Sequence, residues 1–401
     1  MRKQPLDFEG ASVDELTELL GFKCSEVDCA RLEREVTKEE IKEVLFRMPS
    51  NKSPGQDGYT TEFFKEAWEI IGEDITVAIQ SFFITGFLLK GLNSTILALI
   101  PKKDEVKMMK DYRPISCCNV LYKVISKLIA NRLKSVLPKF ITLNQSAFIK
   151  ERLLMENVLL AIELVKDYHS DNISLRCALQ VDISKAFDSV QWTFLLNTLE
   201  ALRLPRKFIS WIARCVTSAS FSVLVNGELA GYFQSRRGLR QGCSLSPYLF
   251  VICMNVLSKL LDAAAFKGEI GYHLKCKNID LTHLCFADDL MIFADGTKHS
   301  VEGILRVFEK FDKKSSGLKI SMEKSVLFMA GDVSREEEIG RQFQFARGRL
   351  PVRYLGLPLL TKNMTVTDFL PLVEKVRKKI SSWTGRFLSY AGRLQLISSV
   401  I

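Results

Sequence analysis

The segment that most constrains this chain is LTHLCFADDLMIFA, in which two adjacent carboxylates, Asp288 and Asp289, separate two apolar runs. Neighbouring side chains diverge on a helix and point to opposite faces of a straight strand, so either element would force one acid towards a core at a cost of several kcal/mol. A tight turn between two short strands removes this conflict because both acids then lie at its tip. A solvated surface hairpin is the ordinary interpretation of such a turn. Flanks this apolar instead favour a central hairpin whose tip has a function.

A second apolar strand also ends in a carboxylate. In CALQVDI, residues 177–183, Ala178, Gln180 and Asp182 share one face and the apolar residues between them share the other. Two strands that deliver acids to one edge supply the oxygen ligands that Mg²⁺ prefers, and two ions about 4 Å apart can hold the attacking and leaving oxygens of a phosphoryl transfer. Three clustered carboxylates would repel one another without such ions. The sequence therefore predicts a divalent-metal site at this edge.

The composition restricts the class of partner. The formal net charge is +10, and residues 1–40 contain more acids than bases, so the rest of the chain is strongly basic. A basic body favours nucleic acid over a membrane as partner, although a solvated Lys-rich surface explains the charge equally well.

The ten cysteines form no CxxC pair, which favours reduced thiols in an intracellular protein. No apolar run of signal length opens the chain, and the uncharged stretch 241–258 contains enough polar residues to favour a buried helix over a membrane span.

Periodicity and turn signals predict a mixture of helices and strands. The predicted helices begin after the N-cap Thr37, run over 61–87 and 119–137, begin near 191, begin with Ser246 as N-cap, run over 300–314, and begin near 366. The predicted strands are 94–102, 177–183, a hairpin around Asn226-Gly227, the hairpin around the paired acids, and a strand pair within LKISMEKSVLFMA. KDYRPIS, residues 110–116, is predicted to be a loop. The 119–137 helix places four basic residues outside its apolar stripe, namely Lys123, Lys127, Arg132 and Lys134.

Several motifs together resemble those of a known family. QVDISKAFDSV, RRGLRQGCSLSPYLF, CFADDLMIF, GLKISMEKS and RYLGLPL resemble, in this order, the successive motifs of the reverse transcriptase palm. NKSPGQDGYT, ILALIPKKDEVKMMKDYRPIS and NQSAFIKERLLMENV resemble finger motifs of non-LTR (LINE-type) retrotransposons, most of all the plant LINE-like lineage. The likeness runs from about Lys38 to the last residue.

The resemblance implies an α+β right-hand polymerase with fingers, a palm built on a small antiparallel sheet, and a partial helical thumb. The expected divisions are an acidic N-terminal segment at 1–37, fingers at 38–176, a palm at 177–350, and a primer-contacting turn with a truncated thumb at 351–401. The reverse transcriptase domain overall would cover about 94–360. The chain is thus expected to lack an endonuclease-like domain before residue 38 and an RNase H region after residue 401.

The resemblance also implies the site residues. Asp182 and Asp288 would bind two Mg²⁺ ions, with Mn²⁺ as a substitute, Asp289 would assist, and the carbonyl of Ile183 would be a further ligand. The implied nucleotide-binding residues are Arg113, Phe187, Gln241, Gly242 and Lys324. The implied template- and primer-binding residues are Lys52, Arg237, Arg240, Tyr354, Leu355 and Gly356.

Chemical reasons support several of these roles. A ring at Phe187 would collide with a ribose 2′-OH and so select deoxynucleotides, although packing at a strand end explains the ring equally well. The guanidinium of Arg113 would make bidentate bonds to a triphosphate. Lys324 would protonate the pyrophosphate that leaves. Arg237 and Arg240 would contact template phosphates, with ordinary surface arginines as the alternative.

The predicted function is RNA-directed DNA polymerase, with an RNA template, a DNA primer and deoxynucleotides as partners, in the nucleus or cytoplasm. A different class of function stays open, namely an inactive retrotransposon-derived fragment that folds and at most binds nucleic acid. An intron-maturase role would require a downstream RNA-binding extension, which this chain lacks. A generic metal-dependent hydrolase would explain the acids but neither Phe187 nor the RQG loop.

Overall fold

The structure, a computed structural model, describes residues 10–170, 173–331, 343, 345–362, 366–381, 389, 391, 392 and 394. The α-helices are α1 (Val13–Leu20), α2 (Glu26–Glu33), α3 (Lys38–Arg47), α4 (Thr61–Glu66), α5 (Trp68–Thr85), α6 (Val120–Val136), α7 (Leu154–Val165), α8 (Ala186–Ser189), α9 (Trp192–Ala201), α10 (Arg206–Thr217), α11 (Ser246–Phe266), α12 (Lys298–Lys310) and α14 (Val366–Ser381). The strands are β1 (Ser94–Pro101), β2 (Tyr112–Cys118), β3 (Arg176–Val181), β4 (Ile183–Ser184), β5 (Ser220–Val225), β6 (Glu228–Gln234), β7 (His283–Phe286), β8 (Asp289–Ala294), β9 (Lys319–Ile320), β10 (Val326–Ala330), β11 (Ala346–Arg347), β12 (Val352–Tyr354) and β13 (Leu357–Leu359).

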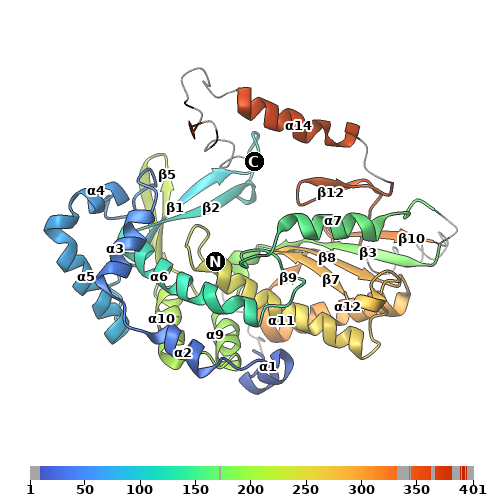
Figure 1. Cartoon of the computed structure of the whole chain (residues 1–401), viewed down its shortest axis with the longest axis horizontal. Helices are drawn as coiled ribbons and strands as arrows, with labels where there is room; N and C mark the ends of the chain where they lie inside the picture. The colour runs from blue at the N-terminus through green and yellow to red at the C-terminus, as the bar shows by residue number, and fades with distance from the viewer. Residues whose placement is uncertain are drawn as a thin grey trace.

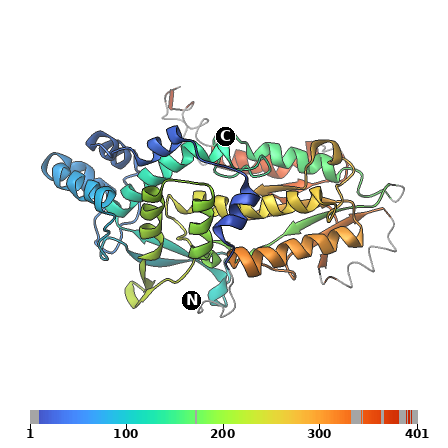
Figure 2. The ribbon, with the colours of Figure 1, turned by 90° about the horizontal axis from the view of Figure 1, so that it is seen from below.

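A five-stranded sheet forms the centre of one half of the molecule, in the order β11-β10-β3-β8-β7 (Figure 1). β3 pairs antiparallel with both β8 and β10, and β7 and β8 form a hairpin. The alternation predicted for residues 177–183 is confirmed. Ala178 and its partner Phe293 pack in a core cluster with α7, whereas Leu179 and its partner Ile292 pack in the main core with α11 and α12. Figures 1 and 2 show α7 on one side of this sheet and α11 and α12 on the other.

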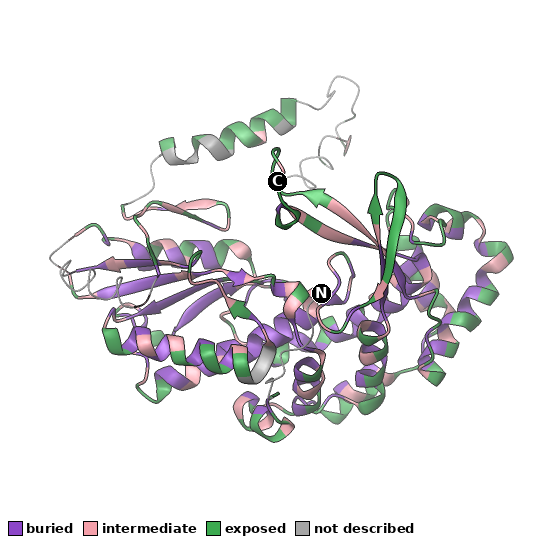
Figure 3. Ribbon diagram, turned by 180° about the vertical axis from the view of Figure 1, so that it is seen from behind, coloured by how far each residue is buried: buried purple, intermediate pink, exposed green. Residues whose placement is uncertain are grey.

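A four-stranded sheet lies in the other half, in the order β2-β1-β5-β6. The prediction that residues 110–116 form a loop is wrong, because most of this segment belongs to β2. Pro114 and the flanking charges weaken the strand signal, but β2 is an edge strand, where a proline removes no ladder hydrogen bond. The hairpin predicted around Asn226-Gly227 is confirmed as β5–β6, and its exposed outer strand is visible in Figure 3.

The sequence boundary at 176/177 does not separate the two sheets. The β5–β6 hairpin, from the predicted palm range, pairs with β1, from the predicted finger range. In the opposite sense, α7 comes from the predicted finger range and packs on the five-stranded sheet. The two strands predicted within LKISMEKSVLFMA are present as β9 and β10, but they do not pair with each other, because β9 pairs with β4 and β10 pairs with β3.

Arg132 is a further correction. The prediction put it outside the apolar stripe of α6, but its side chain is buried. Its guanidinium donates to the carbonyls of Leu32 and Arg34 at 3.2 and 2.6 Å, and to a carboxylate oxygen of Glu40 at 3.1 Å. Through these bonds α6 holds the end of α2 and the start of α3. Residues of α1 and α2 also belong to the main core.

Other predicted boundaries differ by small amounts. The helix predicted over 61–87 is divided at Ala67 into α4 and α5. The predicted N-cap Ser246 is already helical, with Leu245 as the N-cap. Within the described chain, one helix, Ser246–Phe266, has the length and composition of a membrane span, but 78% of its apolar window is buried in the fold, as expected of a core helix. All ten cysteines are free and most are buried, as predicted.

Candidate active site

The paired acids lie at the tip of the β7–β8 hairpin, as predicted. Phe286 pairs with Asp289, which leaves Ala287 and Asp288 as a two-residue loop. Ala287 has a φ of 57°, which matches the first central position of a type II′ turn, where glycine is usual. Leu290 is buried directly behind this tip. The apolar strands therefore fix a polar tip at the end of the sheet.

Asp182 lies in the break between β3 and β4, at the same end of the sheet. Because Val181, the last residue of β3, pairs with Leu290, the register places Asp182 beside Asp289, and the alternation places both acids on the α7 side. The backbone of Asp182 is fixed by its neighbours. Its N–H donates to the hydroxyl of Ser325 at 3.1 Å, and its carbonyl accepts from the N–H of Ser321 at 2.9 Å.

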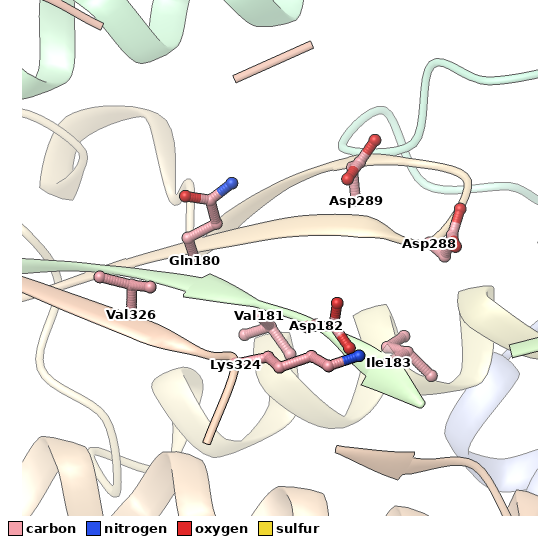
Figure 4. Close-up of a pocket in the computed structure, with 8 residues that line it drawn as sticks. All are labelled: Gln180, Val181, Asp182, Ile183, Asp288, Asp289, Lys324 and Val326. Atoms are coloured by element: carbon pink, nitrogen blue, oxygen red, sulfur yellow. The ribbon is translucent and has the colours of Figure 1, made fainter. Parts of the chain in front are cut away.

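The three acids surround a pocket of about 260 Å³. Its lining residues are Gln180, Val181, Asp182, Ile183, Asp288, Asp289, Lys324 and Val326. Figure 4 shows Asp288 at the tip of its turn, Asp182 on the neighbouring strand, and the ammonium end of Lys324 directed towards Asp182. Lys324 belongs to the turn 321–325, which is also the turn that bonds the backbone of Asp182. The structure therefore brings together the five implied residues Asp182, Ile183, Asp288, Asp289 and Lys324.

The charges around this pocket are unbalanced. Desolvation, followed by the negative charges of Asp288 and Asp182, raises the pKa of Asp289 above its ordinary range. Among the residues that the structure describes, no three acids, cysteines or histidines converge on a single point that would hold an ion. The three carboxylates nevertheless line one pocket, and their negative charges repel one another. This donor set of hard oxygens fits a divalent cation such as Mg²⁺, whose charge would remove the repulsion.

The implied nucleotide-binding residues Phe187, Gln241 and Gly242 lie in two segments that are bonded together. The ring of Phe187 stacks on Phe250 of α11, with centroids 4.6 Å apart. The side-chain amide of Gln241 donates to Asp188 at 3.4 Å, and the backbone carbonyl of Gln241 accepts from Ser116 of β2 at 2.8 Å. Asp188 was missed by the sequence reasoning. Desolvation raises the pKa of Asp188, although its side chain is exposed at the surface of α8.

Two glycines of this loop have positive φ, and a Cβ atom at either would also meet the backbone of a neighbouring segment. Gly242 has a φ of 101°, and a Cβ atom there would lie 3.2 Å from the carbonyl oxygen of Ser116. At Gly238, with a φ of 89°, a Cβ atom would lie 2.8 Å from the carbonyl oxygen of Asp188. The segment RRGLRQG therefore lies close against the backbones of β2 and α8. At both contacts glycine avoids the strain of a positive φ and the contact of a Cβ atom. Arg113 is exposed on β2, three residues before the bonded Ser116.

Two of the implied nucleic-acid contacts lie in the interior. Arg240 is 7% exposed, and its guanidinium donates to Asn93 at 2.7 Å, to Thr95 at 3.2 Å and to the carbonyl of Cys215 at 2.6 Å. It also lies over the ring of Tyr122, 4.0 Å from the centroid. Arg240 is thus neither a surface residue nor available to a template phosphate, and that prediction is wrong. It links β1, α6 and α10 to the RQG loop.

Tyr354 is the second correction, because its side chain is 1% exposed and packs in the core cluster beneath β12 and β13. The turn itself is present. Tyr354 pairs with Leu357, and the two loop residues Leu355 and Gly356 have φ of 50° and 91°, as in a type I′ turn. Lys52 is exposed and Arg237 is half-buried, so both can meet solvent.

Comparison with known proteins is consistent with this geometry. Residues 100–359 match the family described as reverse transcriptase (RNA-dependent DNA polymerase). A 149 kDa protein of transposon TX1 from Xenopus laevis is 31% identical over 92% of this chain and 28% of its own length. A Pol polyprotein of the retrotransposable element R2DM from Drosophila melanogaster is 28% identical over 65% of this chain and 23% of its own length. The RNA-directed DNA polymerase from the mobile element jockey, also from Drosophila melanogaster, is 25% identical over 87% of this chain and 38% of its own length. The chain thus spans well under half of each relative, and the plant lineage stays a prediction.

Proposed function

Because the chain belongs to the reverse transcriptase (RNA-dependent DNA polymerase) family, with relatives from non-LTR retrotransposons, we propose that it adds deoxynucleotides to a primer 3′-OH on an RNA template. The observation that carries this proposal is the meeting of Asp182 and the Asp288-Asp289 turn at one end of the five-stranded sheet, around one pocket. In the right-hand polymerase arrangement, this sheet would be the palm. The β2-β1-β5-β6 sheet with α3–α6 would form the fingers, and α14 the start of a thumb.

The residues of the pocket suit a phosphoryl transfer. Asp182, Asp288 and the carbonyl of Ile183 would hold two Mg²⁺ ions, with Asp289 assisting at the same edge. Bound divalent ions supply charge neutralisation at the attacking and leaving oxygens. Lys324, which belongs to the turn that bonds the backbone of Asp182, would donate a proton to the leaving pyrophosphate.

The surrounding segments would position the substrates. Gln241 and Gly242 would form one wall of the nucleotide site, with Phe187 beneath the sugar and Arg113 on the triphosphate. Arg237, Lys52 and the Leu355-Gly356 turn would contact template and primer. The work of such a site is positioning and electrostatic stabilisation of a transferring phosphate. A nuclear or cytoplasmic location follows from this function.

Primer extension tests the proposal. The purified chain is incubated with an RNA template, an annealed DNA primer, deoxynucleotides and Mg²⁺, and Asp288→Asn serves as the matched variant. We expect template-directed extension that Asp288→Asn abolishes. Extension that survives Asp288→Asn would contradict the metal assignment. Folded protein that binds RNA without extending a primer would support the alternative, an inactive fragment.

A further inference from the structure

Gln145 contacts the catalytic turn although it lies 142 residues before Ala287 in the sequence. The side chain is 1% exposed. Its Oε1 accepts from the backbone N–H of Ala287 at 3.0 Å and from that of Ala147 at 2.9 Å. Because backbone N–H groups only donate, the atom that faces them is the amide oxygen, and the Nε2 group is then directed to Cys285 Sγ at 3.0 Å and to the Ala287 carbonyl at 3.5 Å. One amide therefore contacts both peptide groups of Ala287.

The backbone of Ala287 is strained, and bonds to its peptide groups stabilise it. Its φ of 57° is left-handed, a conformation that costs a non-glycine residue about 1–2 kcal/mol. The peptide group that begins at its carbonyl leads directly into Asp288. A change in the orientation of this peptide would therefore move the carboxylate of Asp288 relative to that of Asp182. Gln145 is the side chain that holds both sides of this strained position.

Gln145 is itself held rigidly. The guanidinium of Arg152 donates to three backbone carbonyls of its segment, those of Ile141 at 2.8 Å, Thr142 at 2.5 Å and Gln145 at 2.6 Å. The backbone of this segment also forms a parallel bridge with Cys285 of β7. The segment is thus joined to the hairpin through backbone as well as side-chain bonds. A rigid support of this kind can transmit a fixed orientation to the turn.

We propose that Gln145 is a positioning residue that sets the orientation of Asp288 through the Ala287 peptide groups, and with it the affinity of the site for divalent cations. The inference deepens the proposed function, since it concerns the ions that the proposed reaction needs. Residues that orient metal-binding groups change metal affinity by about 10–100-fold when they are removed. Loss of the Gln145 amide therefore weakens cation binding more than it weakens the fold.

The test compares Gln145→Met with Asn255→Leu, which are both nearly isosteric removals of a buried amide. Asn255 bonds the same segment, accepting from the N–H of Thr142 at 3.0 Å and donating to the carbonyl of Phe140 at 3.2 Å, but it does not reach the turn. Binding of Mn²⁺ to the full chain is measured from the electron paramagnetic resonance signal of free Mn²⁺, and the thermal midpoint is measured in parallel. The Mg²⁺ dependence of primer extension gives a second readout.

We expect Gln145→Met to weaken Mn²⁺ binding about tenfold or more. Asn255→Leu should lower the thermal midpoint by about as much as Gln145→Met does. It should nevertheless leave Mn²⁺ binding close to that of the unmodified chain. Equal Mn²⁺ binding by Gln145→Met and the unmodified chain would overturn the proposal. Equal weakening by both variants would also overturn it, because the effect would then be general destabilisation. Should Gln145→Met fail to fold, Gln145→Asn keeps an amide in the same interior and withdraws it from Ala287 by one methylene.

The readouts separate this proposal from the proposed function. Asp288→Asn should remove the Mn²⁺ binding that Gln145→Met weakens. If it does not, the ion binds elsewhere and the positioning role is refuted. Selective weakening by Gln145→Met in a chain that extends no primer would support the positioning role while contradicting the polymerase activity.

Discussion

Replacing Arg240 with methionine decides between two opposite roles for a single residue. The RRGLRQG pattern suggests a contact with template phosphates, whereas the structure buries the guanidinium among β1, α6 and α10. A phosphate contact contributes to nucleic-acid binding and almost nothing to folding. A buried guanidinium that joins three elements contributes mostly to folding. The variant Arg240→Met keeps the length and apolar character of the stem and removes only the charged group.

The magnitude follows from the bonds that are lost. Three charge-assisted hydrogen bonds contribute about 1.5–3 kcal/mol each, and a desolvated cation–π contact contributes about 2 kcal/mol. These values are not additive, because the contacts share one group, and the carbonyl of Cys215 keeps the amide of Asn93 at 3.4 Å as a donor. The hydroxyl of Thr95 also loses a bond but keeps the thiol of Cys118 at 3.8 Å, whereas the side-chain oxygen of Asn93 loses its bond of 2.7 Å to Arg240. We therefore expect a loss of about 4 kcal/mol, a large part of the roughly 5–15 kcal/mol that stabilises a typical protein.

The assay is urea unfolding followed by circular dichroism, together with the salt dependence of RNA–DNA duplex binding. Arg237→Met is the matched control, since Arg237 lies in the same loop and is half-buried. Arg240→Met should strongly lower the urea concentration at the unfolding midpoint. In the protein that remains folded, it should leave unchanged the salt slope, which is the slope of the logarithm of the duplex-binding constant against the logarithm of the salt concentration. Arg237→Met should leave the midpoint unchanged and reduce the salt slope by about one unit. An unchanged midpoint for Arg240→Met with a reduced salt slope would refute the interior role.

Three further substitutions test other parts of the molecule. Phe187→Val should reduce the preference of primer extension for deoxynucleotides over ribonucleotides by about 10–100-fold, measured as the ratio of kcat/KM values, and an unchanged ratio would remove Phe187 from sugar selection. Asp28→Asn should destabilise the fold by about 2 kcal/mol at pH 7. The hydrogen bond from Lys139 lowers the pKa of Asp28 in the fold. The stability that the Asp28 carboxylate contributes is therefore fully present above the ordinary aspartate pKa of about 3.9. In pH-dependent unfolding, the difference between Asp28→Asn and the unmodified chain should disappear as the pH falls through the lowered pKa. Asp289→Asn should leave more residual extension than Asp288→Asn. Asp289→Asn should also raise the thermal midpoint at pH 7 in the presence of a chelator. The pKa of Asp289 is raised in the fold, so its charged form lowers stability above that pKa. The increase in thermal midpoint should therefore vanish when the pH is below the ordinary pKa of aspartate.

Local patterns were sufficient to predict the hairpin that carries Asp288 and Asp289. A continuous apolar run on each side, with two acids between, permits few other conformations, and the register confirms the tip. The alternation within residues 177–183 predicted which residues of β3 share a face, but not which helix each face contacts. The common edge of Asp182 and Asp289 also followed, because a shared sheet leaves two antiparallel strand ends side by side.

Pairing between distant strands could not be predicted in the same way. Nothing in residues 220–234 indicates that β5 pairs in parallel with β1, since the hydrophobic pattern would fit either sheet. β2 was missed because Pro114 and neighbouring charges disfavour a strand, while its place at a sheet edge depends on β1. The partners of β9 and β10 were missed because adjacent strands usually form hairpins, and here they pair with β4 and β3.

Buried arginines were the other source of error. Arg132 and Arg240 were interpreted as surface residues because charged side chains are rarely buried without a partner. Their partners are mainly backbone carbonyls and neutral side chains, all more than 90 residues away in the sequence except Cys215, which lies 25 residues from Arg240, and no local pattern reveals them. Gln145 was missed for the same reason. The acids of the site could be predicted and the groups that hold them could not, because the acids break an apolar pattern and their supports do not.

The site forms where three interruptions of regular structure meet at one end of the sheet. The break between β3 and β4 exposes Asp182, the two-residue loop exposes Asp288, and the turn 321–325 presents Lys324. Each interruption is tied to backbone or side-chain groups of another segment, whereas the strands behind them are buried and apolar. The stability of the fold therefore comes from the strands, and the repelling carboxylates add none. A group of charges that costs stability, and is nevertheless held in place by bonds from distant segments, is what the proposed function requires, because a bound cation and phosphate would remove the repulsion.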